Sequence, residues 1–357
     1  MEIYQAGVGV TVGAQMLKWD LLDQEIHRNP LKLPPNTHVN VFINLESVFR
    51  NLSMYKNLQE LIALHKQKVL LELESSILNL VASYRSYFKK EKCLPSVYLY
   101  YTKIDFEKQQ MEVYNKHYRN YYQNRFLQNS QNRSIGNLLN DSILPELKII
   151  LNYTPGCYLI ESNTFDSSLI PKILSSDKNV LISSDIFDTL YLDDPRFIVI
   201  YIKRRYSNFS VISEREEVVR SVVKDSNPFD LTIFNSELYY KLLLSIKGSK
   251  IRNIKSAKWF GYTKFLSILK SGLEKGIVLE NFTCIDSVLE LFPTKYQADI
   301  KSALQCTDLD TQYGLLSETD IQEIRSQVID KSDAQSLLSL NNQRFLDFPI
   351  SISGLIE

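Results

Sequence analysis

The sequence predicts an α/β protein built on a parallel sheet that helices cover on both faces. Two observations support this prediction. Between residues 39 and 205, short β-rich runs alternate with stretches of helical periodicity, as in parallel strands joined by helical crossovers. After about residue 228 the pattern becomes mostly helical, so a helical C-terminal half is expected to follow the sheet.

Each expected element rests on a local pattern. Four β-rich runs predict strands: 96–102 (SVYLYYT), 156–162 (GCYLIES), 179–185 (NVLISSD) and 196–205 (RFIVIYIKRR). A further β-rich run at 39–52 (VNVFINLESVFRNL) predicts a strand that passes directly into a helix. Apolar residues spaced near 3.6 predict a long helix from about 56 to 90, and a shorter helix is expected at 166–176. The segment 316–329 is expected to be a surface helix, because Thr319 followed by Gln322 has the spacing of a capping box.

Composition narrows the class of protein. The 357 residues carry 41 basic and 41 acidic side chains, so any nucleic-acid binding must come from a local basic patch. The four cysteines form no C-x-x-C pair and predict neither a zinc site nor a disulfide framework. No apolar run is long enough for a membrane span, so a soluble cytoplasmic protein without membrane partners is expected.

The source is expected to be viral. Glycine is scarce, at 11 residues, and Tyr reaches 21, with abundant Asn, Ile and Lys. This bias is typical of an AT-rich genome, such as many viruses have. It would place the protein in the host cytoplasm or in association with a virion.

The stretch VLISSDIFDTLYL (180–192) is the first candidate for chemistry. An apolar run ends in two serines and is followed by Asp185 and Asp188. In an α/β sheet, this arrangement presents carboxylates at the carboxyl end of a strand, where binding sites lie. Two interpretations are open. The carboxylates could bind a metal, or Asp185 could cap the following helix by accepting hydrogen bonds from its exposed N–H groups.

The order of the elements resembles the flap endonuclease-type 5′ nucleases, a family with a PIN-like α/β domain and phage members. The segments that carry the resemblance are VFINLE, YLYYTKID, LIESNTFD, ISSDIFD and IKGSKIRNI, in the family's order over roughly residues 39–275. In that family, acidic residues in these segments hold two divalent ions that stabilise the attacking and leaving oxygens of a phosphodiester. The resemblance therefore implies a PIN-like parallel sheet followed by a helix-hairpin-helix.

Most of the family's acidic positions hold other residues here. Asn44 ends the first strand and Thr102 ends the second. In IKGSKIRNI, Ser249 and Arg252 occupy both acidic positions. An arginine projecting into the cluster would supply the positive charge that the ions provide in the family. The resemblance thus implies a nuclease fold with a degenerate metal site.

The surviving acidic residues are few. Glu161 and Asp185 remain in register and are the residual candidate metal ligands, with Asp166 and Asp188 nearby as residual catalytic candidates. No catalytic residue is assigned. Capping or salt bridging is the alternative role for Glu161 and Asp185.

Two segments resemble the family's nucleic-acid contacts. YNKHYRNYYQNRF (114–126) corresponds to the helical arch, and SAKWFGYTKFLSIL (256–269) corresponds to the helix-hairpin-helix. Basic groups can pair with phosphates, and aromatic faces can stack on bases. The candidate nucleic-acid-binding residues are Lys116, Arg119, Tyr122, Arg125, Lys258 and Lys264. The alternative for the first segment is a helix whose tyrosines pack on a neighbour and whose arginines are solvated.

The expected organisation has four parts: an N-terminal extension (1–37), a PIN-like α/β nuclease-like domain (38–227), a degenerate helix-hairpin-helix region (228–292), and a C-terminal helical extension and tail (293–357). Two functions remain open. The favoured one is a non-catalytic 5′-nuclease-like protein of viral type, which needs no cofactor and serves as a subunit of a virion or replication assembly, with or without DNA. The other is an active 5′-3′ exonuclease or flap endonuclease that uses Mg²⁺ or Mn²⁺. In that case the site would be re-formed from the following acidic residues: Glu46, Asp105, Glu161, Asp166, Asp185 and Asp188.

Overall fold

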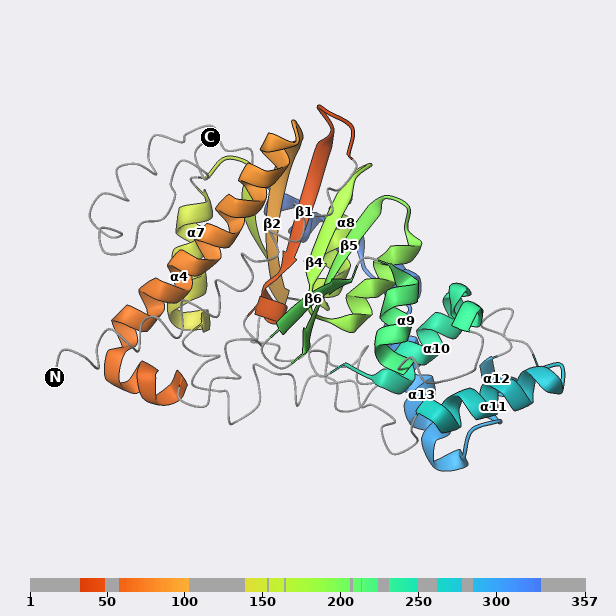
Figure 1. The fold of residues 1–357 in the computed structure, drawn as a ribbon. Helices are drawn as coiled ribbons and strands as arrows, with labels where there is room; N and C mark the ends of the chain where they lie inside the picture. Colours follow the sequence, from red (N-terminus) through yellow and green to blue (C-terminus); the bar gives the residue numbers. More distant parts are fainter. Residues whose placement is uncertain are drawn as a thin grey trace.

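A computed structural model of the chain describes residues 33–48, 58–102, 139–152, 154–163, 165–205, 208–212, 214–223, 231–249, 262–277 and 285–328. Within these residues a six-stranded sheet has the order β3-β2-β1-β4-β5-β6 (Figure 1). The strands are β1 (His38–Asn44), β2 (Leu94–Thr102), β3 (Cys157–Ser162), β4 (Asn179–Ser183), β5 (Phe197–Arg205) and β6 (Asn208–Ile212). The first five pair in parallel, which confirms the predicted α/β fold. β6 pairs antiparallel with β5 and was not predicted.

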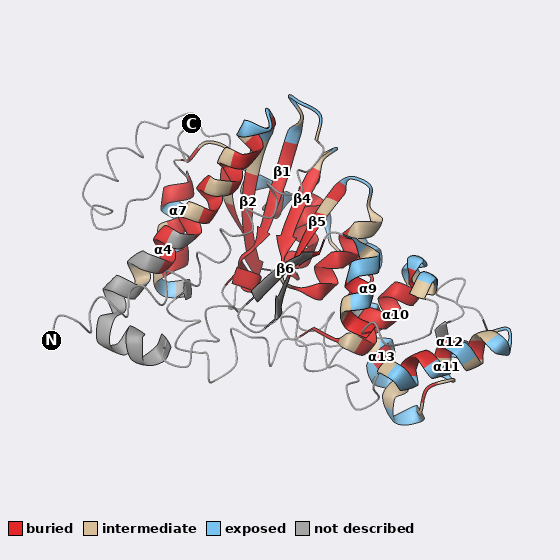
Figure 2. Ribbon diagram, viewed as in Figure 1, coloured by how far each residue is buried: buried red, intermediate tan, exposed pale blue. Residues whose placement is uncertain are grey.

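One face of the sheet packs against two helices. Val41, Ile43 and Leu99 point to this face and share a buried apolar cluster with side chains of α4 (Leu58–Lys90) and α7 (Leu144–Asn152). A π-helical turn, η2 (Leu139–Ile143), leads into α7. The continuous apolar strands are explained by this packing, because each strand must bury both of its faces. Figure 2 shows the strands of the parallel sheet buried along most of their length.

The other face packs against the remaining elements. Phe42, Tyr98 and Leu181 belong to a second buried cluster that includes residues of the C-terminal helices. The elements that contribute to this second cluster are η3 (Ser167–Leu169), α8 (Ile170–Ile173), η4 (Ile186–Asp193), α9 (Arg215–Val223), η5 (Leu231–Asn235), α10 (Glu237–Lys247), α11 (Tyr262–Glu274), α12 (Ile285–Leu289), α13 (Thr294–Thr307), α14 (Leu309–Gly314) and α15 (Glu318–Ser326). The mostly helical C-terminal half is therefore confirmed, and it shares one core with the sheet. The expected domain boundaries stay predictions.

The strand order creates a switch point between β1 and β4. The chain proceeds from β1 through β2 to β3 on one side, and from β4 to β5 on the other. In open parallel sheets, ligands bind outside the carboxyl ends of the strands at such a point. The described helices include none that is long and apolar enough to cross a membrane.

The expected capping box of α15 is displaced by two residues. Thr319 and Gln322 do not form it. Instead, Ser317 accepts a hydrogen bond from the backbone of Asp320, and the Asp320 carboxylate accepts one from the backbone of Ser317. Two signals of the same spacing overlap in LSETDIQEI, and the structure uses the one whose acid lies in the first turn. The predicted helix at 166–176 is also shorter, because it divides into η3 and α8 and ends at Ile173.

Removing the observed cap should weaken α15. We expect Ser317→Ala to lower the free energy of unfolding by about 1 kcal/mol, because the backbone N–H of Asp320 loses its acceptor. Thr319→Ala is the matched control and should change it by less than about 0.5 kcal/mol, since Thr319 is exposed in the first turn. Urea denaturation of both variants measures the difference, and equal losses would contradict the assigned cap.

Candidate functional site

A buried polar cluster occupies the carboxyl ends of β1 and β4, at the switch point of the sheet. Asn44 ends β1, Ser183 ends β4, and Ser47 lies in the helical turn 45–48 that follows β1. The hydroxyls of Ser47 and Ser183 are 3.0 Å apart, and the Ser184 N–H donates to the Ser47 hydroxyl at 3.2 Å. The two strand ends are therefore joined by side chains as well as by the β-ladder.

Asp188 is the acceptor at the centre of this cluster. Its side chain is 0% exposed. Its Oδ2 accepts a hydrogen bond from Asn44 Nδ2 at 3.0 Å and another from the Ser183 hydroxyl at 2.5 Å. An amide and a hydroxyl thus both donate hydrogen bonds to the carboxylate oxygen that faces β1 and β4. Each donor sits at the end of a buried strand, so its position is fixed by the sheet.

Asp185 caps η4, as the capping interpretation of this position predicts. Its Oδ1 accepts from the Phe187 N–H at 3.1 Å and from the Ser249 hydroxyl at 2.9 Å. Ser249 reaches Asp185 because Gly248 ends α10 with a φ of 65°, a conformation that glycine adopts at little cost. The cap therefore ties β4 to the end of α10. Metal binding by Asp185 stays a prediction.

Glu46 and Asp166 lie beside the end of β2. Glu46 Oε1 accepts from the Thr102 N–H at 2.9 Å and from the Ser167 hydroxyl at 3.3 Å. The Ser167 N–H donates to the Thr102 hydroxyl at 3.1 Å. Asp166 caps η3 by accepting from the Ser168 N–H at 2.9 Å. Both acids are buried; Glu46 holds the backbone at the end of β2, and Asp166 holds the backbone of η3.

Glu161 is not brought together with Asp185. It alternates with Ile160 along β3, so its side chain lies on the face that carries α4 and α7, whereas Ser183 and η4 lie on the other face. Two strands separate β3 from β4, a distance of roughly 14 Å. Glu161 accepts from the Tyr101 hydroxyl at 2.8 Å and lies 3.8 Å from Lys148 Nζ. Burial and the neighbouring Glu161 carboxylate raise the pKa of Tyr101 far above its usual value, so its hydroxyl stays protonated and donates.

The described carboxylates accept hydrogen bonds from neighbouring groups of the protein. A pair of divalent ions needs carboxylate oxygens that converge on a shared space. Here one oxygen of each of Glu46, Asp166, Asp185 and Asp188 accepts from backbone N–H, amide or hydroxyl donors, and Glu161 lies on the opposite face. Among the described residues, no three His, Cys, Asp or Glu side chains form a group suited to a metal ion.

Most predicted nucleic-acid contacts lie outside the described residues. This applies to Lys116, Arg119, Tyr122, Arg125 and Lys258, and also to Asp105 and Arg252. Lys264 is described, and it is exposed in the first turn of α11. The prediction that these residues contact nucleic acid is not tested by the structure.

Three residues of the cluster were missed at the sequence level. Ser47, Ser167 and the role of Ser183 as a donor follow from tertiary contacts. A local signal existed for Ser47, because its N–H donates to Asn44 Oδ1 at 3.2 Å, and an Asn followed three residues later by a helical position is a capping signal. The contact between the Ser47 and Ser183 hydroxyls and the contact of Ser167 with Glu46 join residues more than a hundred positions apart and have no local signal.

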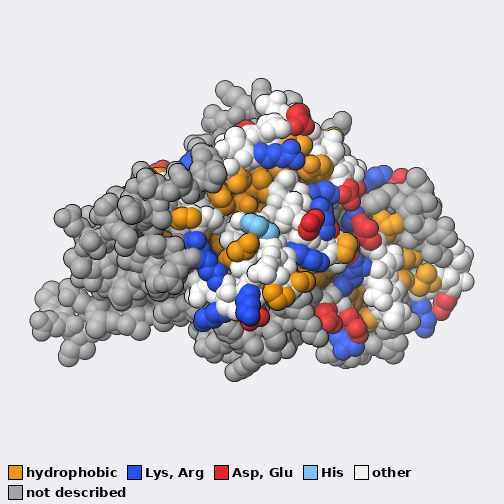
Figure 3. Space-filling view, turned by 90° about the horizontal axis from the view of Figure 1, so that it is seen from above, with side chains coloured by type: hydrophobic (Ala, Val, Ile, Leu, Met, Phe, Trp, Pro, Cys, Tyr) orange, Lys and Arg blue, Asp and Glu red, His pale blue; other side chains and the backbone are white. Residues whose placement is uncertain are grey.

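Exposed basic side chains gather at the other end of the sheet. Figure 3 looks onto the amino ends of the strands, where Lys and Arg side chains surround hydrophobic ones. Lys90 and Lys92 precede β2 there, and Arg196 precedes β5 and pairs with Asp194 at 2.7 Å. These cations lie a strand length away from the polar cluster, so they do not neutralise its carboxylates.

The fold has a distant structural match among solved structures. No family model matches the sequence, and neither does any curated protein. A crystal structure of the flap endonuclease of bacteriophage T5, described as a pseudo-enzyme–product complex with DNA and metal ions, aligns with 14% identity and a TM-score of 0.47. The alignment covers 81% of this chain and 98% of that chain. A similarity of this size does not by itself fix a function.

Proposed function

We propose that the chain is a catalytically degenerate 5′-nuclease-like protein that serves as a structural or nucleic-acid-associated subunit of a larger assembly. The proposal rests on the hydrogen bonds of Asp188, whose Oδ2 accepts one from Asn44 and one from Ser183 inside the core. Asn44 stands where the resemblance places a first-strand acid. An amide at this position donates to a carboxylate, whereas a second carboxylate would repel it unless a cation lay between them.

The neighbouring contacts support the same function. Ser249 stands at another acidic position of the family and donates its hydroxyl to Asp185. Hydroxyl and amide donors thus stabilise the remaining carboxylates within the protein itself. A site of this kind stabilises the fold without requiring a metal ion. Assembly with viral replication or virion components, in a host cytoplasm, is the setting that the composition favours.

The proposal predicts no metal-dependent cleavage. The full chain is incubated with a labelled 5′-flap or nicked duplex and Mg²⁺ or Mn²⁺, and the products are separated on a denaturing gel. We expect the wild type and Asp185→Ala to leave the DNA equally intact. Metal-dependent cleavage by the wild type that Asp185→Ala abolishes would establish the active nuclease instead.

Binding to DNA is measured separately from cleavage. Fluorescence anisotropy of the same flap DNA, with EDTA present, reports association in the absence of turnover. Binding that weakens steeply with salt supports a nucleic-acid-associated subunit, because phosphate contacts release counterions. If the anisotropy does not change when the protein is added, the chain does not bind this DNA. The proposal of a nucleic-acid-associated subunit is then refuted, and only that of a structural subunit stands.

A further inference from the structure

The turns that lead into β1 and β2 form one exposed surface, the amino-end face (residues 34–38 and 90–94). Leu94 and His38 are the first residues of their strands, are partners in the register and are both exposed. The Leu94 N–H donates to the Thr37 carbonyl at 2.9 Å, and the Asn36 N–H donates to the Lys92 carbonyl at 2.7 Å. These hydrogen bonds hold the two turns side by side, so the side chains of both contribute to the same surface.

The amino-end face combines exposed apolar groups with basic ones. Leu94 is 56% exposed, and Pro34 is exposed in the turn before β1. Lys90 and Lys92 are exposed in the turn before β2, with Glu91 between them. Figure 3 shows hydrophobic and basic side chains next to one another on this side of the molecule. Such a face is complementary to an acidic segment that carries large apolar side chains.

The chain itself contains a segment of this chemistry close to the face. Residues 19–27, WDLLDQEIH, carry three acidic residues and neither Lys nor Arg. Trp19, Leu22 and Ile26 recur at the spacing of one side of a helix. The segment lies outside the described residues, and only residues 28–32 separate it from Leu33, where the described chain begins. A tether this short gives the segment an effective concentration in the millimolar range, which favours it over a separate partner.

We propose that residues 19–27 bind to the amino-end face of the same chain, with their apolar side chains against Leu94 and their acids beside Lys90 and Lys92. The apolar contact contributes most of the affinity, because ion pairs at a surface contribute little. The proposal is independent of the proposed function, since it uses none of the carboxylates at the carboxyl ends of β1 and β4. It places the N-terminal extension at the end of the sheet opposite the polar cluster.

Trp19 can report this contact directly. The chain has two tryptophans, so Trp259→Phe leaves Trp19 as the single emitter. In this background, acrylamide quenching measures the bound fraction of the segment, with a peptide of residues 14–32 as the free reference. We expect Leu94→Asp to lower the ratio of bound to free segment about tenfold, because the contact loses its central apolar side chain. Ile149→Asp, at an exposed side chain of α7, is the matched control and should leave the ratio unchanged.

Charge reversal gives a second test that leaves Leu94 intact. Replacing Lys90 and Lys92 together by glutamate should lower the ratio of bound to free segment at least about threefold, because like charges then face each other. Replacing Asp20 and Asp23 together by lysine should have the same effect. Combining all four substitutions should restore the protection of Trp19 from acrylamide.

Controls and contrary outcomes complete the test. Lys270→Glu with Lys275→Glu, at the exposed end of α11, should leave quenching unchanged, and circular dichroism shows whether each variant is folded. Quenching of Trp19 that is as strong in the full chain as in the peptide overturns the proposal. Protection that survives Leu94→Asp overturns it as well, because the segment then binds elsewhere. Protection that increases with protein concentration also overturns it, since the segment then binds a second copy.

Discussion

Replacing Asp188 by alanine is expected to lower the free energy of unfolding by about 3 kcal/mol, because two buried donors lose their acceptor at once. Asn44 Nδ2 and the Ser183 hydroxyl are fixed at strand ends and cannot turn towards water. The alanine methyl removes this acceptor from both, and it leaves the Ser183 hydroxyl only the Ser47 hydroxyl as a neighbouring acceptor. A carboxylate that served only as a metal ligand would behave in the opposite way, since its removal relieves repulsion between acids and often raises stability.

Urea denaturation in EDTA measures this effect without any contribution from divalent ions. Asp177→Ala is the matched control, because Asp177 is exposed in the turn before β4. We expect the control to change the free energy of unfolding by less than about 0.5 kcal/mol. An Asp188→Ala variant at least as stable as the wild type would refute the structural role of this carboxylate.

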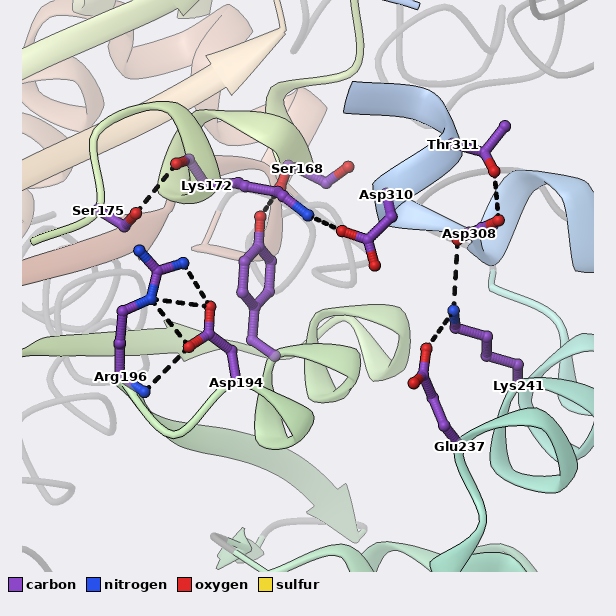
Figure 4. A network of polar contacts seen from close by, with 11 residues as sticks. Ser168, Lys172, Ser175, Asp194, Arg196, Glu237, Lys241, Asp308, Asp310 and Thr311 are labelled. Atoms are coloured by element: carbon purple, nitrogen blue, oxygen red, sulfur yellow. Dashed lines mark hydrogen bonds and ion pairs between the residues drawn. The ribbon is translucent and has the colours of Figure 1, made fainter. Parts of the chain in front are cut away.

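Replacing Lys241 by methionine is expected to cost about 3 kcal/mol, because a buried ion pair is broken while its partner stays in place. Lys241 is 4% exposed and reaches from α10 to Asp308 at 3.3 Å, with Glu237 as a second partner (Figure 4). Methionine keeps the length of the side chain but leaves the Asp308 carboxylate without this cation. Lys301→Met is the control, since Lys301 pairs with Asp286 at the surface and should lose less than about 1 kcal/mol.

The same pair predicts a dependence on pH. Burial acts to raise the pKa of Asp308, but the Thr311 hydroxyl and Lys241 outweigh it and hold the pKa below its ordinary value of 3.8. The stability from this lowered pKa is present above pH 3.8 and is lost as the pH falls through the folded-state pKa. Thermal denaturation between pH 5 and pH 2 should show a smaller loss for Lys241→Met than for the wild type. An equal loss of thermal stability in the two proteins over this pH range would contradict the pairing of Lys241 with Asp308.

The sequence predicts the sheet well because buried parallel strands are read directly from apolar runs. The run at 196–205 nearly coincides with β5, and the segment 39–52, predicted as a strand followed by a helix, begins within β1. β6 was missed because its five residues follow a charged run and resemble a continuation of β5 or a turn. The cap of α15 was misplaced because two capping signals of the same spacing overlap, and the structure uses the one whose acid lies in the first turn.

The candidate site was predictable only in part. Asn44 and Ser249, at positions where the resemblance leads one to expect acids, are visible in the sequence, and so is the ability of Asp185 to cap a helix. Some donors to these carboxylates come from distant segments and have no local signal, such as Ser249 for Asp185 and Ser167 for Glu46. The position of Glu161 on the opposite face depends on strand register, which a one-residue shift would reverse.

The most direct test of the structural role of these carboxylates is a double-mutant cycle between Asn44 and Asp188. The free energies of unfolding of the wild type, Asn44→Ala, Asp188→Ala and the double variant are measured in EDTA and again in millimolar Mn²⁺. A hydrogen bond that stabilises the fold predicts the same coupling, about 1–2 kcal/mol, in both solutions. No coupling in EDTA, together with stabilisation of the wild type by Mn²⁺ that Asp188→Ala removes, would contradict it and identify Asp188 as a metal ligand.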